Sequence, residues 1–104
     1  MSGTTYQLRM YTLVPETAEE FVRLWERDLV PLRSASGFAV VGAWRAPERN
    51  EFCWLVRWDS PGSFQDGERV YYEARDRAAL QWDPKDYIAS MDLRLIEAIA
   101  GHAP

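Results

Sequence analysis

Polar side chains recur at alternate positions of three segments that are typical of β-strands. Because successive side chains of a strand point to opposite faces, residues two apart share a face of the sheet. We expect these polar residues to converge on the face that no helix covers. They are Gln7, Arg9, Tyr11, Arg57, Asp92 and Arg94.

Three guanidinium groups beside a phenol and a carboxylate suit an anionic or phenolate-bearing ligand, because each arginine donates through a planar fork. Such a cluster could also stabilise an enolate by electrostatic preorganisation. The alternative is a set of structural ion pairs, in which Arg9 or Arg94 meets Asp92 and Arg57 meets Glu51. We favour the ion pairs, because networks of this kind occur without any function.

Other chemical groups are sparse. The single histidine, His102, lies two residues before the last residue of the sequence and is expected to be solvated. The single cysteine, Cys53, lies in a buried segment without a histidine partner, so we expect an inert thiol. No acidic pair approaches a complete calcium loop. The nearest are Asp66 with Glu68 and Asp83 with Asp86. The sequence therefore predicts no metal and no tightly bound cofactor.

Size and composition narrow the classes further. The chain has 104 residues, 47% of them hydrophobic, and a net charge of -4, which predicts one globular domain over 1–104. An acidic protein of this kind is a poor partner for nucleic acid or for an anionic membrane. No segment has the length of a membrane span or the character of a signal peptide, so the expected location is cytoplasmic.

The hydrophobic periodicity predicts four strands and two helices. A strand over 6–13 precedes a helix from 17 to about 30, which Pro31 should end. A hairpin joins strands over 38–45 and 51–58. Ser60 and Pro61 are predicted as the N-cap and first residue of a helical region whose main helix covers about 66–80. The last strand covers 87–96.

The segment 51–58 is rich in aromatic and β-branched residues and should lie inside the sheet, covered on both faces. One face carries Phe52, Trp54, Val56 and Trp58, which we expect to pack beneath the helices. The other face carries Cys53, Leu55 and Arg57. We expect Arg57 to mark the side of a ligand pocket.

The order β-α-β-β-α-β predicts a ferredoxin-like α+β fold, with two helices on one face of a four-stranded antiparallel sheet. In this plan the first and third strands are central. We expect the uncovered face to be too apolar to stay wet, because it should carry Tyr11, Leu13, Val41, Leu55 and Ile96. A second copy of the chain would cover it through a two-fold interface, so the sequence predicts a homodimer.

Three segments resemble NIPSNAP-type domains. They are Tyr6-Gln7-Leu8-Arg9-Met10-Tyr11-Thr12-Leu13-Val14-Pro15, Val41-Gly42-Ala43-Trp44 and Trp82-Asp83-Pro84. The likeness spans about residues 5–98. It implies membership of the dimeric α+β-barrel group, which includes cofactor-independent monooxygenases, polyketide cyclases, haem-degrading enzymes and muconolactone isomerases. A tail histidine departs from relatives that rely on a buried one, which argues against haem chemistry.

The resemblance implies a hydrophobic, aromatic or polyketide-like metabolite as ligand, with a non-catalytic binding domain as the alternative. For a cofactor-independent oxygenase, Trp44, Tyr72 and Arg9 are the predicted residues for stacking, proton handling and anion stabilisation. The predicted ligand-binding residues are Tyr11, Arg57, Asp92, Arg94 and Trp82. An open cavity with polar groups aimed into it would favour the enzyme.

Overall fold

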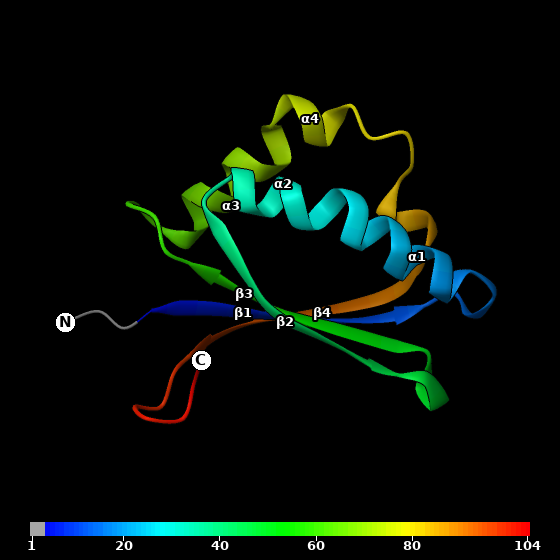
Figure 1. The fold of residues 1–104 in the computed structure, drawn as a ribbon, viewed down its shortest axis with the longest axis horizontal. Coiled ribbons are helices and arrows are strands. Elements are labelled where there is room, and N and C mark those ends of the chain that lie inside the picture. Colours follow the sequence, from blue (N-terminus) through cyan, green and yellow to red (C-terminus); the bar gives the residue numbers. More distant parts are fainter. Residues whose placement is uncertain (1–3) are drawn as a thin grey trace.

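The structure, a computed structural model, describes residues 4–104 as one antiparallel sheet with helices on one side (Figure 1). Its strands are β1 (Thr5–Leu13), β2 (Phe38–Ala46), β3 (Glu51–Trp58) and β4 (Ile88–Glu97), in the spatial order β2-β3-β1-β4. The predicted ferredoxin-like α+β fold is confirmed, with β1 and β3 in the centre. None of the described helices is long and apolar enough to cross a membrane.

The first helical region is longer than the sequence predicts. It consists of α1 (Ala18–Leu24), a π-helical turn η2 (Trp25–Leu29) and α2 (Val30–Ala35), so Pro31 does not end it. In η2 the N–H of Val30 donates to the carbonyl of Trp25, five residues back. This wider turn gives room to a proline ring, which would otherwise meet the carbonyl four residues before it.

The second helical region starts later and ends earlier than predicted. Ser63, rather than Ser60, is the N-cap of α3 (Phe64–Glu73), and its hydroxyl accepts from the backbone N–H of Asp66. The backbone becomes extended at Ala74, with ψ of 139°, before the short α4 (Arg75–Ala78). Ser60 instead donates to the carbonyl of Gly37 at 3.0 Å, which ties the end of β3 to the start of β2. The remaining 3-10 turns are η1 (Pro15–Thr17), η3 (Pro47–Arg49) and η4 (Pro84–Asp86).

The strand register shows which side chains lie beneath the helices. In β3, Phe52, Trp54 and Val56 are buried in the core as predicted. In β1, Arg9 lies opposite Trp54 and Tyr11 opposite Phe52. Directly opposed residues share a face, so Gln7, Arg9, Tyr11 and Leu13 lie on the helix-covered side. Their predicted place on the uncovered face is wrong.

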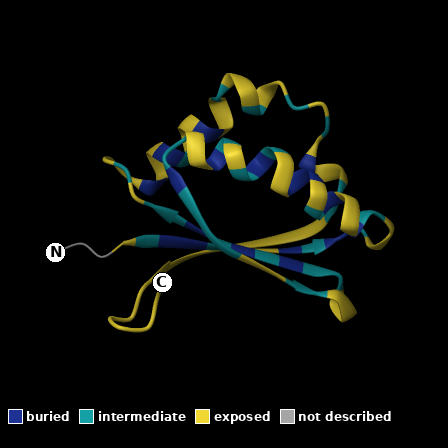
Figure 2. Cartoon of the chain, in the orientation of Figure 1, coloured by how far each residue is buried: buried dark blue, intermediate teal, exposed yellow. Residues whose placement is uncertain are grey.

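The aromatic core joins the helices to the sheet. Trp25 of η2 packs edge-on against Trp54 and Phe52, with ring centroids 5.4 and 5.0 Å away. Phe21 of α1 lies 5.5 Å from Phe52 in a similar arrangement. Such edge-to-face contacts add to the free energy of burial. Figure 2 shows the buried residues between the helices and the central strands, while β4 and the C-terminal segment stay exposed.

Candidate functional site

Arg9, in the middle of β1, is the centre of a polar cluster beneath the helices. It is only 3% exposed. Its Nε donates to Tyr11 Oη at 2.8 Å, its Nη1 to Gln7 Oε1 at 2.6 Å and its Nη2 to Tyr72 Oη at 3.0 Å. The alternation of β1 thus aligns three polar side chains on one face, and α3 supplies the fourth.

Arg9 keeps its positive charge although it is buried. Burial is the largest single influence and works against the charged form. The oxygens of Tyr11 and Tyr72 and the carboxylate of Glu68 outweigh it, so the net effect raises the pKa of Arg9 above its ordinary value. Arg9 is therefore a permanent cation in the interior.

Arg33 is a second buried cation, fully enclosed between α2, β2 and α3. Its guanidinium forms an ion pair with Glu68 and stacks on the ring of Tyr71, with 3.8 Å from Cζ to the ring centroid. Glu68 also lies 3.8 Å from Arg9, between Nη1 and Oε2. One carboxylate thus serves two buried guanidinium groups.

The two tyrosines of α3 line the same region. Tyr71 is buried, and burial raises the pKa of its phenol, although Arg33 and Arg77 oppose this effect. Tyr72 is 44% exposed and receives the hydrogen bond from Arg9. Arg77 of α4 lies over both rings, 5.6 Å from the centroid of Tyr71 and 5.5 Å from that of Tyr72. Aromatic faces and cations therefore alternate here.

These residues surround a cavity of about 230 Å³ between the sheet and the helices. Its walls come from both central strands, from η2, α2, α3, α4 and η4, and from the start of β4. Four lining residues are cationic: Arg9, Arg33, Arg77 and Lys85. Within residues 4–104, no acidic side chain lines it. The cavity can hold a small flat molecule that carries negative charge.

The structure brings together only some of the predicted site residues. Arg9, Tyr11 and Tyr72 meet at the cavity. Arg57, Asp92 and Arg94 lie on the opposite face of the sheet, where Arg57 pairs with Asp59 at 2.8 Å and Arg94 with Asp92 at 3.0 Å. The predicted pair of Arg57 with Glu51 is therefore wrong, whereas the pair of Arg94 with Asp92 is confirmed. The six polar residues do not converge on one face.

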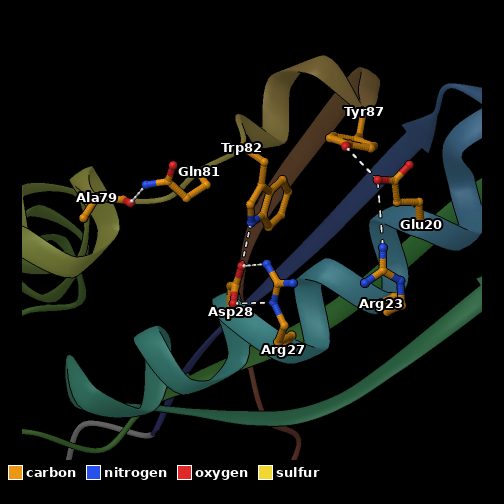
Figure 3. Close-up of polar contacts among 8 residues, drawn as sticks. All are labelled: Glu20, Arg23, Arg27, Asp28, Ala79, Gln81, Trp82 and Tyr87. Atoms are coloured by element: carbon orange, nitrogen blue, oxygen red, sulfur yellow. Dashed lines mark hydrogen bonds and ion pairs between the residues drawn. The ribbon is translucent and has the colours of Figure 1, made fainter.

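The two predicted tryptophans lie away from the cavity. Trp44 is 55% exposed on the open face, opposite Cys53. Trp82 packs edge-on against Phe21 and Tyr87, at 6.2 and 5.6 Å. Its indole Nε1 donates to Asp28 Oδ2 at 2.7 Å, as Figure 3 shows. Trp82 therefore fastens the segment after α4 to the first helical region.

Sequence reasoning did not assign to the site five of the charged and aromatic residues that line the cavity: Arg33, Trp54, Tyr71, Arg77 and Lys85. Arg33 lay beyond the predicted end of its helix. A signal for it exists, because Phe21, Trp25, Leu29 and Arg33 follow one another at intervals of four, the spacing of one helical face. Trp54 was assigned to the core, where it lies, but it also forms a wall of the cavity.

A larger hollow of about 690 Å³ lies over the ends of β1, β3 and β4. It is open to solvent, and its acidic residues Asp59 and Glu97 are exposed, so it holds no buried charge. Across the described part of the chain, no three histidine, cysteine or acidic side chains gather as a metal site. The cavity around Arg9 is thus the stronger candidate.

The fold and this site define the chain as a small ferredoxin-like α+β domain with a cavity between its sheet and its helices. The NIPSNAP family model matches residues 6–100. The chain therefore belongs to the NIPSNAP family. A search of curated proteins found no match.

Solved structures agree on the fold. A NIPSNAP domain protein from Burkholderia xenovorans superposes with a TM-score of 0.82 at 11% identity, covering 96% of this chain and 99% of that one. A NIPSNAP family protein from Agrobacterium tumefaciens gives 0.83 at 11% identity, with coverage of 95% and 96%. A candidate antibiotic biosynthesis monooxygenase from Caulobacter crescentus gives 0.71 at 15% identity, with coverage of 93% and 91%.

Proposed function

We propose that this protein binds a small aromatic or polyketide-like metabolite in the cavity around Arg9, and that it acts on this metabolite as a monooxygenase or cyclase without a bound cofactor. The observation that carries the proposal is a buried, permanently charged guanidinium at the wall of a cavity that Tyr11, Trp54, Tyr71 and Tyr72 also line. The likeness in fold to a candidate antibiotic biosynthesis monooxygenase supports the proposed class of reaction.

The proposed chemistry uses Arg9 and Tyr72. A phenol or enol that loses its proton becomes an oxyanion, and a preorganised guanidinium stabilises that charge. The Tyr72 hydroxyl, 3.0 Å from Arg9 Nη2, is the proposed group for proton handling. Trp54 takes the stacking role expected of Trp44, because it lines the cavity whereas Trp44 does not. In an oxygenase of this type, one atom of O₂ enters the substrate carbon and the other leaves as water, with the electrons supplied by the substrate.

The alternative is a binding domain without catalysis, and one observation favours it. All three nitrogens of Arg9 already have partners within the chain, namely Tyr11, Gln7 and Tyr72. A guanidinium held through all three nitrogens in this way can be structural, with two of its five N–H donors left for a ligand. Activity must therefore be measured rather than assumed from geometry.

The proposed assembly is a homodimer through the open face of the sheet. This face carries exposed apolar side chains, including Met10 at 37%, Trp44 at 55% and Ile96 at 38%. The C-terminal segment covers only part of it, where Tyr6 Oη donates to the carbonyl of Pro104 at 2.8 Å. Light scattering after size exclusion should give twice the mass of the chain at micromolar concentration. A monomer would contradict the proposed dimer.

The activity test is incubation of the protein with 1-naphthol under oxygen, against a reaction without protein. Entry of one atom of O₂ at C4 gives 1,4-naphthoquinone, and the other atom leaves as water. We expect the protein to increase the rate of quinone formation. In Arg9→Gln this rate enhancement should fall at least 100-fold, because a donor to the developing oxyanion is lost. Tyr72→Phe should lower turnover and preserve the fold. Unchanged turnover in both variants would contradict the proposed roles.

A further inference from the structure

The cavity contains more positive charge than its surroundings neutralise. Arg9 and Arg33 are 3% and 0% exposed, and both form an ion pair with the single carboxylate of Glu68. The half-buried Arg77 and the exposed Lys85 add two further cations at the solvent-facing part of the walls. An interior cation without a counter-ion is costly, because little water is present to solvate it.

Hydrogen bonding shows the same imbalance. Among the described residues, the buried side-chain atoms that lack a partner are all N–H donors: Trp25 Nε1, Arg33 Nε, Arg45 Nη1, Trp54 Nε1 and Arg77 Nε. Three of these five belong to side chains that line the cavity, namely Arg33, Trp54 and Arg77. Buried donors in proteins normally meet acceptors. The walls of the cavity are therefore rich in donors and carry no acidic acceptor among the described residues.

We infer that the ligand of this cavity is an aromatic monoanion, a one- or two-ring molecule whose oxyanion neutralises the excess charge around Arg9, Arg33 and Arg77. This inference rests on the proposed function, since it requires that the cavity bind a small molecule. The rings of Trp54, Tyr71 and Tyr72 offer flat apolar walls. A cavity of about 230 Å³ lies below the roughly 300–1,000 Å³ of ordinary ligand pockets, which favours one or two rings over three.

The oxyanion can be a carboxylate or the ionised oxygen of a phenol or enol. Both accept charge-assisted hydrogen bonds from guanidinium groups. They differ in their response to pH, because an aromatic carboxylate is ionised throughout the neutral range whereas a simple phenol ionises only near pH 10. A carboxylate should therefore bind equally from pH 6 to 9, and a phenol should bind more tightly as the pH rises.

The experiment is titration calorimetry with 2-naphthoate, its neutral isostere 2-naphthamide, and 2-naphthol. We expect 2-naphthoate to bind at least about ten-fold more tightly than 2-naphthamide, the ratio typical of one charge-assisted hydrogen bond. Arg77→Gln should reduce this ratio about five-fold or more. Arg69→Gln is the matched control, because Arg69 is an exposed cation on the neighbouring helix α3 that pairs with Asp66. It should leave the ratio unchanged. Binding of 2-naphthol that strengthens with pH would support the phenolate form.

Three results would overturn the inference. Equal affinity for 2-naphthoate and 2-naphthamide would show that charge is not recognised, while the proposed binding of aromatic metabolites would stand. Absence of binding by all three probes would reject both. A ratio that falls equally in Arg77→Gln and Arg69→Gln would also reject the inference, because it would indicate general electrostatic attraction instead of a built site.

Discussion

The two faces of the sheet use arginine in opposite ways. On the open face, Arg57 and Arg94 each pair with an aspartate two residues away on the same segment, and both remain in contact with solvent. On the covered face, Arg9 and Arg33 are buried and reach partners far away in the sequence, above all Glu68. An exposed ion pair between neighbouring residues leaves no charge unbalanced. A shared, distant carboxylate leaves charge unbalanced, and that imbalance makes the covered face a candidate binding site.

The same contrast holds for two pairs of glycine and tryptophan. On the covered face, a Cβ on Gly67 of α3 would lie 2.3 Å from the ring of Trp58, which also packs 4.8 Å from Phe38. On the open face, a Cβ on Gly42 would lie 2.7 Å from the ring of Trp44, which is 55% exposed. The first ring is held in place, whereas the second is free to move. An added methyl group therefore meets a fixed ring on the covered face and a movable ring on the open face.

The largest predicted effect is that of Glu68→Gln. It removes the one carboxylate beside two buried guanidinium groups, and breaking a buried ion pair on one side costs about 3–5 kcal/mol. We expect about 3 kcal/mol, because the Glu68 side chain is 20% exposed. Urea unfolding followed by tryptophan fluorescence measures the loss.

The matched change on the open face is Asp92→Asn, which breaks the exposed pair with Arg94. Exposed ion pairs contribute at most about 1 kcal/mol, so its urea midpoint should stay close to that of the unmodified protein. Equal losses in Glu68→Gln and Asp92→Asn would break the contrast between the two faces.

The second prediction compares Gly67→Ala with Gly42→Ala. The methyl group at 67 must displace the packed ring of Trp58, and overpacking of this kind costs about 1–3 kcal/mol. The methyl group at 42 meets a ring that can turn into solvent, so we expect about 0.5 kcal/mol or less. Thermal unfolding of both variants measures the difference, and a larger loss at 42 would contradict the account.

The third prediction concerns the anchor of Trp82. The Arg27 guanidinium lowers the pKa of the Asp28 carboxyl, burial opposes this, and the Trp82 N–H adds to the lowering. Asp28 therefore stabilises the fold at pH values above its ordinary pKa of 3.8, and this contribution is lost as the pH falls through the lower pKa of the folded state. Asp28→Asn should lower the free energy of unfolding by about 1 kcal/mol at pH 7. At pH 2 the variant and the unmodified protein should be equally stable, and urea unfolding at both pH values measures the two differences. A loss that persists at pH 2 would contradict it.

The smallest effect concerns Cys53 on the open face. Burial, and after it the Glu51 carboxylate, raises the pKa of this thiol. Only the thiolate reacts, so its alkylation by iodoacetamide should require a higher pH than that of a free thiol. Glu51→Gln should shift the rate profile to lower pH. No shift, or a shift to higher pH, would show that Glu51 does not act on Cys53.

The sequence predicted the fold because the strand periods, the hairpin and the order of elements agree with one another. It also predicted the core face of β3, since Phe52, Trp54 and Val56 are too large and apolar for any other place. For β1 the alternation separates two faces but does not say which one the helices cover. Both faces are mixed, with Arg9 and Tyr11 on one and Tyr6 and Met10 on the other. Only the pairing with β3 decides between them.

The site was harder to predict for the same reason. Arg9 and Tyr72 were named, but their partner Arg33 lies beyond Pro31, and only the π-helical turn allows the helix to continue that far. A hydrogen-bonding pattern five residues long leaves no clear mark in a single sequence. Arg77 was not assigned to the site, because the break at Ala74, which turns α4 over the two tyrosines, is a feature of the backbone.

The most direct test of the central claim uses two tryptophans as reporters of the two faces. Trp54 lines the cavity on the covered face, and Trp44 lies exposed on the open face. Their indole N–H signals can be assigned in ¹⁵N–¹H spectra from Trp54→Phe and Trp44→Phe. On titration with 2-naphthoate, we predict a saturable shift of the Trp54 signal while the Trp44 signal stays in place. A saturable shift of Trp44 with a constant Trp54 would place the ligand on the open face and contradict the account.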